Sequence, residues 1–300
     1  MVTLSAWVQS WIDRRTMRLA PSTLSGYCRM WRKYVEPSEA GRLEMDAVEP
    51  EDLIVMLSPI IAQGHTRAAQ LVQVLVGAAL RDACRRRVLG WNPMDCVDRV
   101  QHHRERTAWL TTEQARQLLE ATEGEPFYAA WLLMLCCGLR RGEMLGLKWE
   151  DVDLDRRLLH VRRQRIRVDG QILETKPKTE ASIREIPLAD PLMDFLGQHW
   201  GEGCYVLGGD VPTSDKQLEK ALDGALNRAK LPHVSLHGLR HTMASTAAGQ
   251  GIPIKVLQEI MGHAQYTTTA DVYAHIDRRE VLHASKIVAF ATFGARLEIA

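Results

Sequence analysis

The sequence predicts a mostly α-helical protein with one small antiparallel β-sheet, divided into two domains. Apolar residues recur at helical spacing through most of the N-terminal third and again beyond Asp190. Strand-like alternation is confined to residues 158–188. Residues 99–108 are polar and lack apolar periodicity, which marks a linker between a domain at 1–98 and one at 109–300.

The N-terminal domain is expected to hold helices that begin at recognisable signals. One begins at Pro21, with Ser22 or Thr23 as its N-cap. A second follows the acidic turn at residues 49–52. A third, spanning about residues 66–88, ends in cations that suit the negative end of a helix dipole.

The second domain opens at Thr111, which has capping-box spacing to Gln114. An apolar helix at residues 127–137 follows. Residues 158–168 then alternate apolar side chains with arginine, and Asp169-Gly170 predicts a hairpin turn with a return strand at 171–175. A further strand is expected at 183–188. Helices are expected again after Asp190.

Bulk properties narrow the class of protein. The 46% hydrophobic and 25% charged residues are ordinary globular composition, and the net charge of +1 means that any basic surface must be local. No apolar run approaches the ~20 residues of a membrane span, and no export signal is visible. The six cysteines form no Cys-x-x-Cys pair, which favours a reduced, cytoplasmic protein. We expect no metal and no cofactor.

Six residues of the second domain indicate a catalytic function only when they are considered as a set. Each alone has an ordinary explanation, such as a surface ion pair, a solvated loop lysine, a helix cap or a packing tyrosine. Together, two arginines, a lysine, two histidines and a tyrosine are what phosphoryl transfer at a diester requires. In chain order they are Arg140, Lys178, His237, Arg240, His263 and Tyr273.

These segments resemble the tyrosine recombinase (phage integrase) family. The matching stretches are Gly138–Leu154, Pro177–Thr179 with Arg184–Leu188, His237–Thr242, and Met261–His263 followed by Asp271–His275. Their order and spacing fit the family over about residues 107–285. The resemblance implies a helical core-binding domain followed by an α+β catalytic domain. It implies a site-specific recombinase or integrase that cuts and rejoins DNA without a metal.

The resemblance also assigns roles around the scissile phosphate. Arg140 and Arg240 would clamp it, and His263 would donate a further hydrogen bond. Glu143 would support the arginines.

The proton carriers and the nucleophile follow in the same way. Lys178, which precedes Thr179 as the family pattern does, is preferred over Lys176 as the group that protonates the leaving 5′ oxygen. His237 would act in proton transfer on the nucleophile side. Tyr273 would form a 3′-phosphotyrosine bond; it is preferred over Tyr266 by its spacing from His263.

Two arginine clusters are candidate contacts to double-stranded DNA: Arg85, Arg86 and Arg87, and Arg162, Arg163, Arg165 and Arg167. Helix-dipole pairing and a solvated strand edge are the alternatives. The family suggests a homotetramer on two DNA sites, with the C-terminal helix exchanged between protomers. An accessory DNA-bending or directionality protein is a further possible partner, and no membrane is expected.

Two other functions remain open on the sequence. A resolvase or topoisomerase-like nicking-closing enzyme would use the same residues. A non-catalytic DNA-binding regulator would lack at least one of them, and none is missing.

Overall fold

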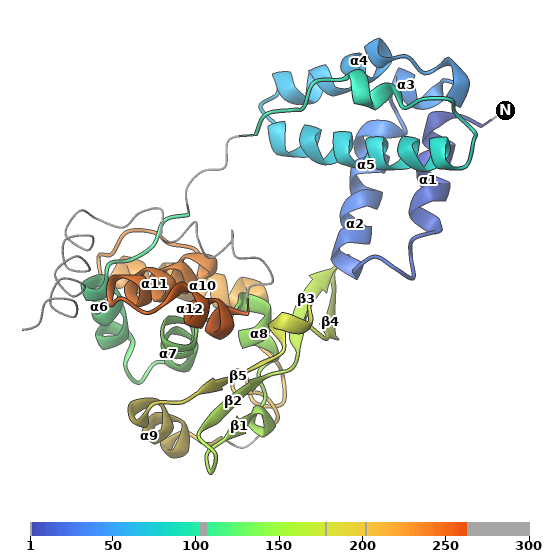
Figure 1. The fold of residues 1–300 in the computed structure, drawn as a ribbon. Coiled ribbons are helices and arrows are strands. Elements are labelled where there is room, and N and C mark those ends of the chain that lie inside the picture. Colours follow the sequence, from blue (N-terminus) through green and yellow to red (C-terminus); the bar gives the residue numbers. More distant parts are fainter. Residues whose placement is uncertain (1, 103–106, 178, 202, 263–300) are drawn as a thin grey trace, which may run out of the picture. The chain divides into compact units, whose positions relative to one another are not determined.

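The computed structural model describes residues 2–102, 107–177, 179–201 and 203–262 (Figure 1). The chain forms two compact units, one of residues 1–105 with 167–171, the other of residues 106–166 with 172–300. Helices dominate both, and the strands form small antiparallel sheets, so the predicted fold class is confirmed. No helix of the described residues is long and apolar enough to cross a bilayer.

The first unit is a helical cluster around α5. Its core includes Leu53, Val72, Leu75 and Leu80, which are fully buried. The long α5 packs against α1, α2 and α4. The helices are α1 (Leu4–Asp13), α2 (Pro21–Met30), a π-helical turn (Trp31–Val35), α3 (Glu39–Arg42), α4 (Pro50–Ala62) and α5 (Thr66–Arg85), with 3₁₀ turns at Met45–Ala47 and Pro93–Cys96.

The start and stop signals of this unit were predicted only in part. The expected N-cap at Ser22 or Thr23 was wrong: Ala20 is the N-cap residue of α2, and no side chain caps the helix. Pro21 at the first helical position begins it instead, because its fixed φ suits a helix start. Helix α5 ends earlier than expected, at Arg85, and Arg87 adopts a left-handed φ of 61° just beyond it.

The second unit surrounds a core that includes Trp131, Leu133, Met134 and Leu239. Helix α11 packs against α7, and α6 and α10 lie against the same group of helices (Figure 1). Thr111 and Gln114 form the expected capping box at α6. The helices are α6 (Thr112–Thr122), α7 (Tyr128–Cys137), α8 (Arg141–Gly146), α9 (Asp190–Gln198), α10 (Asp215–Arg228), α11 (Leu236–Gly249) and α12 (Ile254–Met261), with 3₁₀ turns at Trp149–Asp151 and Glu180–Ser182.

The strands form two small sheets where one was expected. In the first, β2 (Leu158–Val161) lies between β1 (Val152–Asp153) and β5 (Arg184–Pro187), with both pairings antiparallel. In the second, β3 (Gln164–Val168) pairs with β4 (Gln171–Thr175). The expected strand at 158–168 is therefore two strands. The Asp169-Gly170 turn is confirmed, since both residues have positive φ, 49° and 84°.

Candidate active site

Two left-handed glycines place backbone carbonyls at the candidate site. Gly138 ends α7 with φ 61°, and Gly262 ends α12 with φ 60°. A glycine in this conformation stops a helix without steric cost. The last carbonyls of both helices then have no partner within the helix. Arginine side chains from other elements donate to them.

Arg240 is buried between the ends of these two helices. It lies on α11, which Ser235 caps as predicted by accepting from the backbone N–H of Gly238. Its Nη1 donates to the Gly138 carbonyl and its Nη2 to the Met261 carbonyl, and the residue is 1% exposed. Burial and the neighbouring Arg140 charge lower the pKa of Arg240 to about 9, so it is still a cation at neutral pH.

Arg140 reaches the next carbonyl of the same helix end. Its Nη2 donates to the carbonyl of Gly262 at 2.7 Å, and its Nη1 to Glu143 Oε1 at 2.6 Å. The side chain keeps 31% of its surface exposed. Arg140 and Arg240 therefore bind consecutive carbonyls, Met261 and Gly262, although they are far apart in sequence.

Glu143 is the buried carboxylate of this cluster, with a side chain only 1% exposed. It accepts from the Arg140 backbone N–H at 2.9 Å and from Arg184 Nη2 at 3.0 Å. Burial would raise the pKa of Glu143, but the charges and hydrogen bonds of Arg184 and Arg140 outweigh it and hold the pKa below its usual value. The carboxylate is therefore ionised.

The sequence assigned no role to Arg184 or Ser182. Arg184 lies on β5, and its side chain is 6% exposed. Ser182 Oγ accepts a hydrogen bond from Arg140 Nη1 at 3.3 Å. Arg184 stands inside a stretch that matched the family, but a single arginine on a short strand has no spacing signal of its own.

The described cluster has an excess of positive charge. Three guanidinium groups, those of Arg140, Arg184 and Arg240, accompany one carboxylate, that of Glu143. A surplus of buried cations is costly unless an anion can bind. Arg140, with 31% of its side chain exposed, is the most accessible of the three cations. The geometry suits a phosphate.

His237 lies one helical turn before Arg240 on α11. Its ring contacts that of His241 at 4.9 Å between centroids. The residue keeps an exposed surface. Partial burial of the ring, together with the charges of His241, Arg240 and Arg140, lowers the pKa of His237 to about 4. The imidazole is therefore neutral at physiological pH and can accept a proton.

Comparison with known protein families identifies the family. The family model described as "Phage integrase family" matches residues 108–280, more than half of the chain. The chain belongs to the phage integrase family. The predicted family and enzyme class, a site-specific DNA recombinase of the tyrosine type, are confirmed.

Curated relatives extend over most of the chain at low identity. The tyrosine recombinase XerC-like protein of Caldanaerobacter subterraneus subsp. tengcongensis is 25% identical, over 92% of this chain and 80% of that protein. Tyrosine recombinase XerD of Neisseria meningitidis serogroup B is 27% identical, over 89% and 90%. The transposase from transposon Tn916 of Enterococcus faecalis is 29% identical over 55% of this chain and 47%, about half, of its own length.

Solved integrase structures share the fold. The Tn1549 transposon integrase in complex with transposon right end DNA superposes with a TM-score of 0.80 at 22% identity, covering 96% of this chain and all of that one. A lambda integrase tetramer bound to a Holliday junction gives 0.69 at 19% identity, covering 90% and 77%.

Half of the predicted catalytic set is brought together in the described part of this integrase. Arg140, His237 and Arg240 belong to it. Lys178, His263 and Tyr273 lie outside the described residues. Among the residues that are described, no group of three or more His, Cys, Asp or Glu side chains could hold a metal ion.

The hairpin arginines differ in what they contact. Arg162 is exposed. Arg163 pairs with Glu150 at 2.5 Å and with the buried Asp151 at 3.2 Å. Arg165 is 7% exposed, with its guanidinium 5.2 Å from the centroid of the Tyr205 ring. The last two are held by the protein, so DNA contact by Arg163 and Arg165 stays a prediction without support from this arrangement.

The arginines at the end of α5 divide in the same way. All three are exposed, but Arg86 pairs with Asp82 at 2.9 Å. Arg85 and Arg87 are therefore placed to meet a ligand without breaking an ion pair that the structure shows.

The lowered pKa of His237 gives a test of its protonation state. The folded protein should keep the imidazole neutral down to about pH 4. The unfolded chain binds a proton below its ordinary pKa of about 6.5. His237 therefore removes stability as the pH falls from about 6.5 towards 4.

An NMR titration of the histidine ring signals checks this, with His237→Gln assigning the resonance. We expect the His237 signal to show no midpoint above about pH 5. A midpoint at or above 6.5 would contradict the account of its environment.

Proposed function

We propose that this integrase cuts and rejoins DNA through a covalent 3′-phosphotyrosine bond to Tyr273. The observation that carries the proposal is the arginine pair Arg140 and Arg240, held on the consecutive carbonyls of Met261 and Gly262. The chain leaves this cluster directly toward His263 and, ten positions later, Tyr273. The carbonyls that hold the two arginines thus lie shortly before the proposed nucleophile in the sequence.

The arginines would bind the scissile phosphate. Guanidinium forks match the non-bridging oxygens, and their charge persists at every physiological pH. The transition state carries more negative charge on these oxygens than the ground state does, so preorganised cations lower the barrier. Arg140 and Arg240 are preorganised because backbone carbonyls and Glu143 hold them before DNA arrives. His263 would add one hydrogen bond.

Three groups would carry the reaction itself. The Tyr273 hydroxyl attacks phosphorus and loses its proton, and the 5′ oxygen of the broken bond leaves and gains one. Lys178 would supply the second proton. Neutral His237 would act on the nucleophile side: its lowered pKa keeps the ring unprotonated at physiological pH, and it also makes the imidazole a weak base. The phosphotyrosine keeps the energy of the diester bond, so rejoining by reversal needs no ATP and no metal.

Both units would contact double-stranded DNA. Residues 1–98 would form the core-binding domain and 109–300 the catalytic domain, joined by the linker at 99–108. Arg85, Arg87 and Arg162 are the arginines that we propose for backbone contacts, because they are exposed and make no ion pair that the structure shows. Such contacts position a protein without reading sequence.

Recombination requires two DNA sites, so we propose a homotetramer that works on cytoplasmic DNA. The similar lambda integrase is described as a tetramer bound to a Holliday junction. In this chain the segment after Tyr273 carries Val281, Leu282, Ile287 and Phe290, which need an apolar partner. We propose exchange of this segment between protomers, with an accessory DNA-bending or directionality protein as a further partner.

A nicked suicide substrate tests the nucleophile. The wild type should accumulate a covalent protein–DNA adduct, because the short strand diffuses away after cleavage. Tyr273→Phe should form none, while Tyr266→Phe serves as the matched control and forms adduct. Adduct bands on a denaturing gel give the measurement. An adduct in Tyr273→Phe would show that another residue attacks.

Arg240→Ala tests the phosphate clamp. We expect cleavage to fall by about 10²–10³-fold, since the cation acts mainly on transition-state charge. The Kd for duplex DNA should change less than about threefold. Single-turnover cleavage and fluorescence anisotropy measure the two, and thermal unfolding reports whether the variant folds. A folded variant that cleaves at the wild-type rate would show that Arg240 is not part of the active site.

Truncation tests the assembly. Deleting residues from 284 onward should weaken tetramer formation on paired DNA sites while binding to a single site persists. Native gels and mass photometry distinguish the two species. Tetramer formation at wild-type protein concentrations by the truncated chain would refute the exchange.

A further inference from the structure

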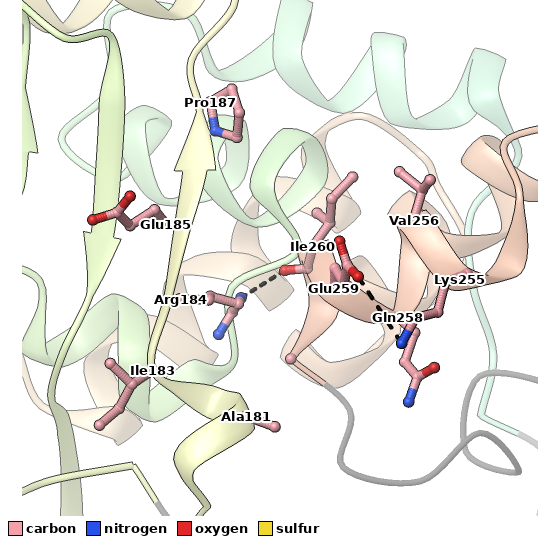
Figure 2. A pocket seen from close by; sticks show the side chains of 11 residues that line it. Ala181, Ile183, Arg184, Glu185, Pro187, Lys255, Val256, Gln258, Glu259 and Ile260 are labelled. Carbon is pink, nitrogen blue, oxygen red and sulfur yellow. Dashed lines mark hydrogen bonds and ion pairs between the residues drawn. The ribbon is translucent and has the colours of Figure 1, made fainter.

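We infer that Arg184 is a positioning residue that keeps the Arg140 charge available to the scissile phosphate. The inference rests on the proposed function, and it adds a residue that binds no phosphate itself. Figure 2 shows the Arg184 side chain between β5 and the end of α12, beside a cavity of about 660 Å³ that Ile183 and Val256 also line.

Every nitrogen of the Arg184 guanidinium is already engaged by protein. Nε donates to the carbonyl of Ile260 at 2.6 Å, the contact drawn in Figure 2. Nη1 donates to Glu143 Oε1 at 3.2 Å and to the Ser182 carbonyl at 3.1 Å, and Nη2 donates to Glu143 Oε2 at 3.0 Å. Only 6% of the Arg184 side chain is exposed, so the guanidinium is buried within the protein.

Glu143 is shared between two arginines. Oε1 accepts from the side chains of Arg140 and Arg184, and Oε2 accepts from Arg184 and from the Arg140 backbone N–H. One carboxylate can neutralise one guanidinium. Because Arg184 supplies the buried countercharge, the charge of the more exposed Arg140 is left for an anion. Without Arg184, the carboxylate of Glu143 would pair with Arg140 alone and would neutralise the Arg140 charge.

Arg184 also fixes the carbonyl that Arg140 uses. A Cβ at Gly262 would lie 3.1 Å from Arg184 Cδ, 3.2 Å from its Nη1 and 2.8 Å from the Ala181 carbonyl. The glycine backbone thus packs directly on the Arg184 side chain. The hydrogen bond to Ile260 binds the same last turn of α12. A displaced Arg184 would therefore release the Gly262 carbonyl as well as Glu143.

Lysine cannot replace this geometry. Two carboxylate oxygens and the Ile260 carbonyl lie around Arg184, and a planar fork with several donors reaches all three. An ammonium is a single point of charge on a flexible stem. Arg184→Lys should therefore keep the countercharge and lose part of the positioning, with a defect smaller than that of Arg184→Gln.

A charge-balanced double variant separates positioning from simple loss of structure. Arg184→Gln should slow single-turnover cleavage of the suicide substrate by about 10–100-fold, with DNA affinity changed less than about threefold. Adding Glu143→Gln removes the carboxylate that lost its partner, and glutamine at this position still caps α8. The double variant should therefore cleave faster than Arg184→Gln alone. Arg228→Gln, which breaks the exposed pair with Glu125, is the matched control and should cleave like wild type.

A methylphosphonate at the scissile position gives the second readout. It carries one negative charge fewer, so it depends less on the Arg140 charge. The defect of Arg184→Gln should be smaller on it than on phosphate. An equal defect on both substrates, a double variant no faster than Arg184→Gln, or wild-type cleavage by Arg184→Gln would overturn the inference. Tyr273→Phe in the same assay reports on the proposed function separately, since an adduct there refutes that function whatever Arg184 does.

Discussion

The buried carboxylate of Glu143 is the interaction on which the candidate site depends. An ionised carboxylate at 1% exposure is tolerated only with full compensation. Two arginines and one backbone N–H give it that compensation, and in doing so they connect the start of α8 to β5. Arg184 then reaches the end of α12. Glu143, together with its partner Arg184, thus fixes the positions of α8, β5 and α12 around the phosphate clamp.

The arginines also depend on how two helices end. Helix C-termini carry partial negative charge and carbonyls without helical partners. Glycine at 138 and at 262 ends α7 and α12 in left-handed turns, and Arg240 binds a carbonyl from each end. Residues that stop the helices therefore also provide acceptors for a buried cation. This explains how a protein with a net charge of only +1 can concentrate positive charge where a phosphodiester would bind.

Some local signals in the sequence predicted local structure correctly. Ser235 caps α11, and the Asp169-Gly170 turn forms as expected, because each depends on neighbours in sequence. The pairing of β2 with β5 could not be predicted in this way, since the β3–β4 hairpin separates the two strands in the sequence. Alternation made Arg163 and Arg165 look like a basic edge, whereas carboxylates and Tyr205 engage them. Arg184 was missed for the same reason, since its partners Glu143 and Ile260 lie far from it in the sequence.

The central claim is that Arg140 and Arg240 form one phosphate site next to the nucleophile. The most direct measurement is a crystal structure of the integrase on nicked DNA with vanadate in place of the scissile phosphate. We expect vanadium bonded to the Tyr273 oxygen, with the Arg140 and Arg240 guanidinium groups within hydrogen-bond distance of its equatorial oxygens. Vanadate bound away from either arginine, or bonded to a different side chain, would contradict the account.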